Sequence, residues 1–161
     1  MANNCFNYIQ VFGSERGVNM IYENLIKGRY DNDISLLGLG DYNSGSTSFD
    51  FSAESKWSPP RELVQMFSAD YKCLVECEYD EFGSDIGGKF AYDKGKLVYN
   101  IEMTYLESKY HSLDWNEFLE CEVMWRLEDP EPFDEFIEPF KEFCSDGEII
   151  ELEELFFEHS N

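Results

Sequence analysis

Positive charge and histidine are scarce in this chain, and each shortage excludes a class of function. Twelve Lys and Arg stand against 34 Asp and Glu, so the formal net charge is -22 at pH 7. A surface of this sign repels nucleic acid and anionic membranes, and we expect direct binding to neither. The two histidines, His111 and His159, lack the context of a nucleophile triad, which needs a Ser or Cys beside a His oriented by a carboxylate.

Phosphate-binding and metal-binding motifs are missing as well. The run 87–89, Gly-Gly-Lys, lacks the Walker spacing and the following Ser or Thr of a phosphate loop. On a strand, Cys73 and Cys77 would have Cα atoms about 13 Å apart, which is too far to hold one zinc ion. The acidic run 80–85 lacks the EF-hand ligand order, so a solvated loop is favoured over a calcium site. We predict no catalytic residues, no metal and no cofactor; an enzyme whose site has no motif is the open alternative.

Long apolar runs and a secretory signal are also missing. No stretch approaches the roughly 20 apolar residues of a membrane span, and the start of the chain does not combine a basic segment with an apolar run. The five cysteines are odd in number, widely spaced and without a C-x-x-C pair. This usage is typical of a reduced compartment, so we expect free, mostly buried thiols and a cytoplasmic protein.

Aromatic residues, by contrast, are abundant: 14 Phe, 10 Tyr and 3 Trp make up 17% of the chain. Acidic disordered proteins are poor in aromatic residues, because they cannot bury enough apolar surface to offset the entropy of ordering. This chain has enough apolar residues to form a core, and its 161 residues fit one domain. We therefore predict one folded domain, residues 1–161, which salt or a basic partner would stabilise.

Alternating apolar and polar residues predict strands, and Asp93-Lys94-Gly95 predicts a tight hairpin between the last two. The predicted strands are 5–12, 46–53, 71–79, 86–93 and 96–105. The segment 31–48 reads as a Gly-, Ser- and Asn-rich connection, broken by a short apolar patch at 34–39. Hairpin-linked strands with helices on one side predict an α+β fold with an antiparallel sheet.

Helix signals lie between these strands. Ser14 is a predicted N-cap and Gly28 a predicted C-cap around an apolar stripe. Ser58, followed by two prolines, is a second predicted N-cap with proline in the first turn. We expect Trp57 to pack this second helix onto the sheet, with a ligand-facing aromatic as the alternative.

The last third of the chain is predicted to be helical. Asp114 is a predicted N-cap, and Pro130 and Pro132 open a further helix. The phenylalanines of 133–143 are more typical of a core than of a binding groove, and Pro139 within them predicts a kink or a break. For residues 148–159 the pattern fits both a helix and an edge strand.

Two groups of motifs stand out in their order along the chain. They are Asn3-Asn4-Cys5-Phe6-Asn7 leading to Gly13, and then Trp57-Ser58-Pro59-Pro60, Phe82-Gly83 and Gly87-Gly88-Lys89-Phe90. In this order residues 3–93 resemble the phage and plasmid proteins called YubB-like or Api92-like, although Asn4 replaces an aromatic residue that is usual in that opening. The resemblance implies a ferredoxin-like domain, an origin in a mobile element and a bacterial host. The family has no established catalytic site, so the resemblance supplies no site residues.

Charge divides the chain into two parts. We expect a ferredoxin-like α+β part at 1–107 and an acidic, mainly helical part at 108–161. Residues 114–161 hold 17 acidic and 2 basic residues, against 7 and 4 in residues 1–60. A net charge of about 2–8 in magnitude is enough to keep a small domain soluble, so this excess needs another explanation.

Partner binding is the explanation that we favour. Duplex DNA carries one charge per about 1.7 Å of axis, so 22 negative charges match roughly 37 Å of duplex. Carboxylates fixed on helices can then occupy a basic groove of a host nucleic-acid-binding protein, as an anti-CRISPR or anti-restriction inhibitor would. The residues predicted to pair with the partner's Arg and Lys are Glu128, Asp129, Glu131, Asp134, Glu135, Glu138 and Glu142, with Glu151, Glu153 and Glu154 as a second group.

A second hypothesis stays open beside this one. An acidic interaction module could make mainly apolar contacts through exposed Phe, Tyr or Trp. Salt separates the two hypotheses, because binding driven by charge weakens as ionic strength rises and apolar association does not. The sequence leaves the identity of the partner and the oligomeric state open.

Overall fold

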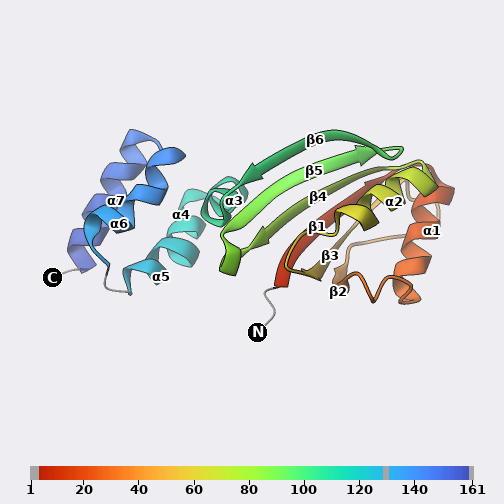
Figure 1. The fold of residues 1–161 in the computed structure, drawn as a ribbon, viewed down its shortest axis with the longest axis horizontal. Helices are drawn as coiled ribbons and strands as arrows, with labels where there is room; N and C mark the ends of the chain where they lie inside the picture. The colour runs from red at the N-terminus through yellow and green to blue at the C-terminus, as the bar shows by residue number, and fades with distance from the viewer. Residues whose placement is uncertain (1–3, 129–130, 160–161) are drawn as a thin grey trace. The chain divides into compact units, whose positions relative to one another are not determined.

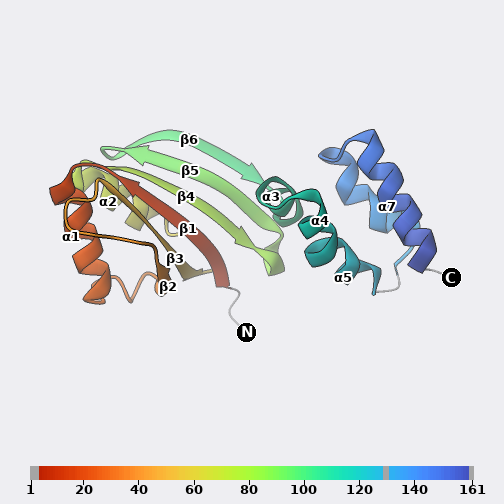
Figure 2. The same cartoon turned by 180° about the vertical axis from the view of Figure 1, so that it is seen from behind.

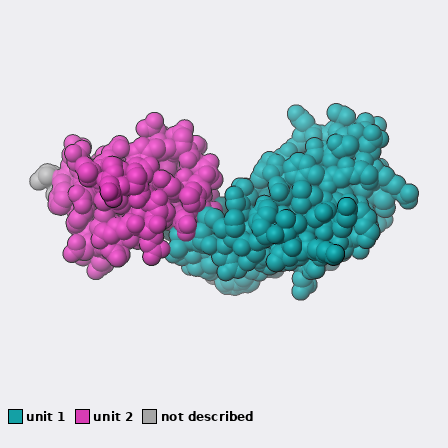
Figure 3. All heavy atoms as spheres, turned by 90° about the horizontal axis from the view of Figure 1, so that it is seen from above, with its two compact units in different colours: residues 1–105 teal, residues 106–161 magenta. Residues whose placement is uncertain are grey.

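The computed structural model describes residues 4–128 and 131–159. The chain divides into two compact units, which Figure 3 colours separately: unit 1, Met1–Tyr105, and unit 2, Leu106–Asn161. Each unit has its own cluster of buried apolar side chains. The expectation of a single domain with parts 1–107 and 108–161 stays a prediction.

A six-stranded antiparallel sheet forms the frame of unit 1. The strands are β1 Asn4–Phe12, β2 Ser35–Leu39, β3 Ser48–Lys56, β4 Leu74–Glu81, β5 Ile86–Asp93 and β6 Lys96–Met103. Their order across the sheet is β2-β3-β1-β4-β5-β6, and this succession can be followed in Figures 1 and 2. The predicted α+β fold with an antiparallel sheet is confirmed.

The first six elements have the ferredoxin-like arrangement that the resemblance implied. In chain order they are β1, α1 (Glu15–Ile26), β2, β3, α2 (Arg61–Tyr71) and β4. In space β1 lies between β3 and β4 and is antiparallel to both, and β2 flanks β3. This is the split β-α-β-β-α-β arrangement, and the hairpin of β5 and β6 extends it beyond β4.

Both helices of unit 1 bury an apolar stripe against the same face of the sheet (Figure 1). As predicted, the Ser14 side chain caps α1 by accepting from the Gly17 N–H, and Gly28 follows the helix with a φ of 67°. Ser58 was wrongly predicted to cap the second helix. The N-cap of α2 is Pro60, which has no side-chain hydrogen bond, while the Ser58 carbonyl accepts from the Ser55 hydroxyl.

The apolar patch at 34–39 was wrongly assigned to a loop: residues 35–39 form the edge strand β2. Four of its five residues pair with β3, with a register shift between Leu36 and Gly38, and this irregularity breaks the alternation that identifies a strand. The predicted strand at 71–79 starts too early, because Tyr71 is the last residue of α2. The predicted hairpin is confirmed, with positive φ angles of 48° at Lys94 and 82° at Gly95.

Unit 2 is built of short helical segments. They are α3 Tyr105–Ser112, α4 Trp115–Phe118, the π-helical η2 Leu119–Val123, α5 Met124–Leu127, α6 Phe133–Ile137, the 3-10 segment η3 Glu138–Glu142 and α7 Asp146–His159. Asp114 caps α4 through the Glu117 N–H, as predicted. Residues 148–159 are helical, which decides between the two patterns that the sequence allowed.

A phenylalanine-rich core holds these segments together. Phe118, Phe136 and Phe140 are fully buried, and Leu152 of α7 lies among them. The expectation that the phenylalanines of 133–143 form a core is therefore confirmed. Pro139 lies in the first turn of η3, where the α-helical pattern of α6 gives way to 3-10 geometry. The predicted opening of this helix at Pro130 lies outside the described residues, and Pro132 is the N-cap of α6.

Candidate acidic binding surface

The predicted partner-binding carboxylates are spread over four segments of unit 2. Glu128 follows α5, Glu131 precedes α6, and the remaining residues lie on the helical segments that pack over the core. Asp129 lies outside the described residues. Glu131 and Glu153 are partly buried, whereas the others that the structure describes are exposed: Glu128, Asp134, Glu135, Glu138, Glu142, Glu151 and Glu154. Their role in binding stays a prediction.

Lys141 marks the place where the two predicted groups come together. Its ammonium lies 2.7 Å from the carboxylate of Glu138, on the same segment. The hydrogen bond that Lys141 donates to Glu138 raises the pKa of Lys141, and the charges of Glu138, Asp134 and Glu153 raise it further. Asp134 belongs to α6 and Glu153 to α7, so the charges of carboxylates from three consecutive segments act on one cation, which pairs directly with Glu138. Negative charge exceeds positive charge around Lys141.

Arg126 neutralises another of the predicted residues internally. Its guanidinium Nη2 lies 3.1 Å from Glu131 Oε1, and its Cζ lies 5.6 Å from the centre of the Phe140 ring and 6.0 Å from that of Phe136. Both partners of the ion pair are largely shielded from solvent. Glu131 therefore contributes to the packing of unit 2 and is a weaker candidate for partner binding than the exposed carboxylates.

Glu148 and Glu151 anchor α7 to the segments before it. The Tyr110 hydroxyl donates to Glu148, and the Trp115 Nε1–H donates to Glu151 Oε2 at 2.9 Å. The Ser145 hydroxyl and N–H also donate to Glu148, and these bonds hold the pKa of its carboxyl below the usual range. Glu148 was not among the predicted residues; its position three residues after Ser145 is the signature of a capping box.

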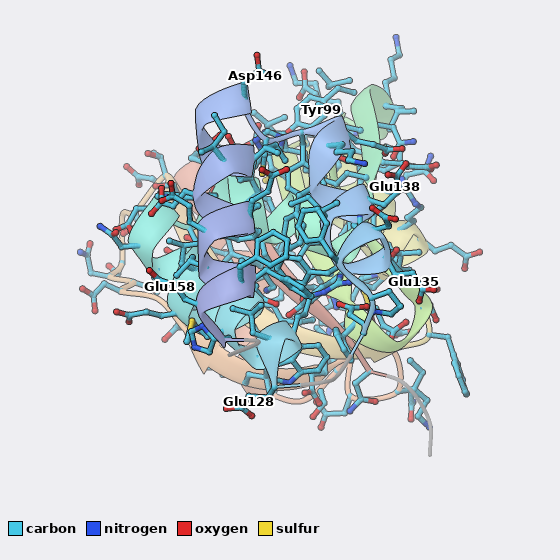
Figure 4. The ribbon with its side chains drawn as sticks, turned by 90° about the vertical axis from the view of Figure 1, so that its left-hand side faces the viewer. Tyr99, Glu128, Glu135, Glu138, Asp146 and Glu158 are labelled. Atoms are coloured by element: carbon cyan, nitrogen blue, oxygen red, sulfur yellow. The ribbon has the colours of Figure 1, made fainter. Side chains whose placement is uncertain are left out.

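Seen from one end, the carboxylates point away from the core in several directions (Figure 4). Glu135 and Glu138 lie on the same side, Glu158 lies on the other side of α7, and Asp146 and Glu128 point toward opposite ends. The interactions of Lys141 are what link predicted residues of both groups. We call this set of residues the Lys141 cluster: Asp134, Glu138, Lys141 and Glu153.

The cysteines and histidines form no site in the described ranges. The five cysteines are all free, with Cys5, Cys73 and Cys77 buried in unit 1. Burial raises the pKa of the Cys5 thiol to about 12, and the Asp80 charge contributes to the rise. Across residues 4–128 and 131–159, no group of three or more His, Cys, Asp or Glu is arranged to hold a metal ion.

Two polar features of unit 1 escaped the sequence analysis. Glu81 was placed in a solvated loop, and this was wrong: it is 3% exposed, and its Oε1 accepts from the Gly83 N–H while Oε2 has no hydrogen-bond partner among the described residues. The alternation of buried and exposed positions along β4 already places the side chain at position 81 toward the core.

The second feature is a hollow of about 840 Å³ at the start of α2. Its charged lining residues are Asp31, Asp33, Glu54, Lys56, Arg61 and Glu62.

Trp57 does not pack α2 onto the sheet, so that interpretation was wrong. It is 56% exposed and has a φ of 68°, which is uncommon for a large side chain.

In the described part of the chain, no helix combines the length and the apolar character that crossing a membrane requires.

Comparison with known proteins relates the chain to one family. Residues 39–121 match the family described as "Ferredoxin-like domain in Api92-like protein". This range overlaps the stretch 3–93 on which the resemblance was based and continues to residue 121. A solved structure, that of a protein Api92 from Yersinia pseudotuberculosis, matches with 26% identity and a TM-score of 0.37. The match covers 43% of this chain and 24% of that chain, and no curated protein matches.

Proposed function

The chain belongs to the family of Api92-like proteins with a ferredoxin-like domain, and from this premise we propose that it is a non-catalytic binding protein. In this proposal the carboxylates of unit 2 occupy a basic groove of a host nucleic-acid-binding protein and keep nucleic acid out of it. The protein would act for a phage or plasmid as an anti-CRISPR or anti-restriction inhibitor does.

The observation that carries this proposal is the Lys141 cluster. Asp134, Glu138 and Glu153 come from three segments fixed over a phenylalanine core, and the charges of all three act on the Lys141 ammonium, which lies 2.7 Å from Glu138. Carboxylates held on a folded scaffold lose less conformational entropy on binding than carboxylates on a flexible tail. They also attract a basic surface over a Debye length of about 8–10 Å at ordinary salt.

The test reverses four charges together in D134K/E135K/E138K/E142K. We expect this variant to lose the partner and keep its helical circular dichroism, because all four side chains are exposed. The matched control E15K/D31K/D41K/E62K changes the net charge by the same amount on exposed positions of unit 1 and is expected to retain binding.

Each protein serves as bait for a bacterial lysate, with elution by rising salt and then by duplex DNA. Support is a basic nucleic-acid-binding protein that the wild type and the control retain, that the unit 2 variant loses, and that DNA displaces. Retention by the unit 2 variant, or a partner that resists high salt and DNA, would contradict charge mimicry.

The second candidate is a module that binds through apolar contacts. The observation that favours it is the exposure of large side chains: Trp57 is 56% exposed, and Leu97 and Val98 of the edge strand β6 are 54% and 58% exposed. Its signature in the same experiment is a partner that both charge-reversal variants retain at high salt. Trp57→Ser would then weaken binding.

A further inference from the structure

One face of the sheet in unit 1 has no helix of that unit against it. On β1 the side chains at 5, 7, 9 and 11 enter the core under α1 and α2, so those at even positions point to the opposite face. We call this the helix-free face. In register with Phe6 lie Glu54 on β3 and Asp80 on β4, and in register with Tyr8 lie Ser52 and Glu78.

Aromatic rings lie in the middle of this face. Phe6 is 39% exposed although β1 is a central strand of the sheet. Tyr8 is partly buried, and its hydroxyl faces a carboxylate: burial raises the pKa of Tyr8, and the charge of Asp50 raises it further. Tyr99 on β6 has the same surroundings, because burial and then the charge of Glu76 raise its pKa. Rings and carboxylates therefore alternate across the face.

The charge of the face limits what can cover it. Strands β3, β1 and β4 present five carboxylates and one lysine, Lys56, and β5 adds Lys89 opposite Glu78, so that negative charge still exceeds positive charge on this face. The carboxylates are Asp50, Glu54, Glu76, Glu78 and Asp80. A second copy of the chain would place like charges together, and nucleic acid would be repelled. A cationic polypeptide is the partner that the charge favours.

Elsewhere in the chain, the cation that lies beside both an aromatic ring and a carboxylate is the arginine guanidinium. The guanidinium of Arg61 lies with Cζ 4.2 Å from the centre of the Phe90 ring, and its Nη2 is 3.8 Å from Glu102. Arg126 of unit 2 likewise lies near the Phe140 ring and pairs with Glu131. A planar guanidinium can stack on a ring and pair with a carboxylate at once, which an ammonium does less well. The six strands supply rings and carboxylates but contain no arginine.

We propose that the helix-free face binds the arginine side chains of a basic polypeptide segment. Phe6 and Tyr8 supply the rings, and Glu54, Glu78 and Asp80 supply the carboxylates on either side. The inference concerns unit 1 and does not rest on the function proposed for unit 2.

The chain offers a matched pair of variants for the test. Phe6 and Phe12 lie on the same strand and face and are 39% and 38% exposed. Their register neighbours differ, because Phe12 lies opposite Ser48 and Leu74 instead of two carboxylates. The probe is a labelled synthetic peptide with four arginines spaced by serine, together with its lysine counterpart, and binding to the full chain is measured by fluorescence anisotropy.

We expect Phe6→Ala to weaken binding of the arginine peptide about fivefold and Phe12→Ala to change it less than about twofold. The wild type should prefer the arginine peptide to the lysine peptide. The same measurements in the D134K/E135K/E138K/E142K background remove the attraction of unit 2, and the Phe6 effect should persist there. Failure of the unit 2 proposal would leave this result unchanged.

Three outcomes would overturn the inference. The first is an equal effect of Phe6→Ala and Phe12→Ala, or no preference for arginine. The second is a wild-type dimer in sedimentation that Phe6→Ala dissociates, since a second copy would then cover the face. The third is binding of a single-stranded oligonucleotide that Phe6→Ala weakens. If Phe6→Ala fails to fold, Glu78→Gln replaces it, with the exposed Glu62→Gln on α2 as its control.

Discussion

Unit 1 and unit 2 differ both in charge density and in the way they are held together. Unit 1 has 16 acidic and 9 basic residues in 105, whereas unit 2 has 18 and 3 in 56. Unit 1 is held by ladders between strands far apart in sequence, and unit 2 by phenylalanines from helical segments that follow one another. The unit with the higher density of negative charge is thus also the one with the smaller apolar core.

The largest expected effect sharpens this comparison by disrupting the core of unit 2 alone. Leu152 is fully buried, so Leu152→Ala should lower stability by about 2–5 kcal/mol. Because a core built from 56 residues has a small margin of stability, unit 2 should unfold while unit 1 stays folded. In a Trp57→Phe background, fluorescence of Trp115 and Trp125 reports on unit 2, and amide NMR signals report on unit 1. Ile150→Ala, 55% exposed on the same helix, is the control; simultaneous loss of unit 1 would break the comparison.

The next largest effect is expected on the stability of unit 1, when a glycine of its sheet is replaced. Gly88 on β5 has a φ of 151°, and a Cβ there would collide with the backbone oxygen of Ile101 on β6. Gly88→Ala should therefore lower the free energy of unfolding of unit 1 by about 1–3 kcal/mol, with unit 2 unaffected. Urea unfolding followed by NMR separates the two units. Gly38→Ala, where a Cβ meets nothing within 4 Å, is the control and should be nearly neutral.

A smaller effect is expected from Glu148, and it depends on pH. The folded-state pKa of Glu148 is lowered, so its ionised form stabilises unit 2 above the unfolded pKa of about 4.3. This contribution disappears as pH falls through the lower folded-state pKa. Glu148→Gln should destabilise unit 2 by about 1 kcal/mol near pH 7, and the difference from wild type should vanish near pH 3. Denaturation at the two pH values checks this; a constant difference would refute it.

The smallest effect compares the charge of the two units directly. Raising NaCl from about 0.05 M to about 0.5 M shortens the Debye length and screens repulsion between carboxylates. Unit 2 should gain more stability than unit 1, by less than about 1 kcal/mol. Thermal melts followed by the two sets of NMR signals measure both changes, and an equal gain in both units would count against a special role of charge in unit 2.

Alternation and capping made most of unit 1 predictable from the sequence. The apolar patterns located five of the six strands, and Ser14 with Gly28 placed the ends of α1. The edge strand β2 was missed because its register shifts and its residues alternate poorly. The cap at Ser58 was misplaced because its carbonyl, not its side chain, takes part in the local bond with Ser55.

The candidate surface was predictable in composition but not in arrangement. Net charge identified the carboxylates, yet no sequence spacing shows that Glu131 pairs with Arg126 or that Glu151 accepts from Trp115. Nor does sequence spacing show that the charge of Glu153 on α7 acts on Lys141 of the 3-10 segment η3. Long-range packing, which a local pattern does not encode, decides which acids are left to face a partner.

The central position of β1 in the sheet has a consequence for folding during translation. Asn7 on β1 donates to Ser55, 48 residues later, and β1 also pairs with β4, where Cys77 lies 70 residues from Asn7. Because β1 precedes both partners in the chain, its two edges stay uncovered until β3 and β4 have been translated. At about 5–20 residues per second this wait lasts several seconds, during which the β1 strand is exposed to chaperones and to mispairing.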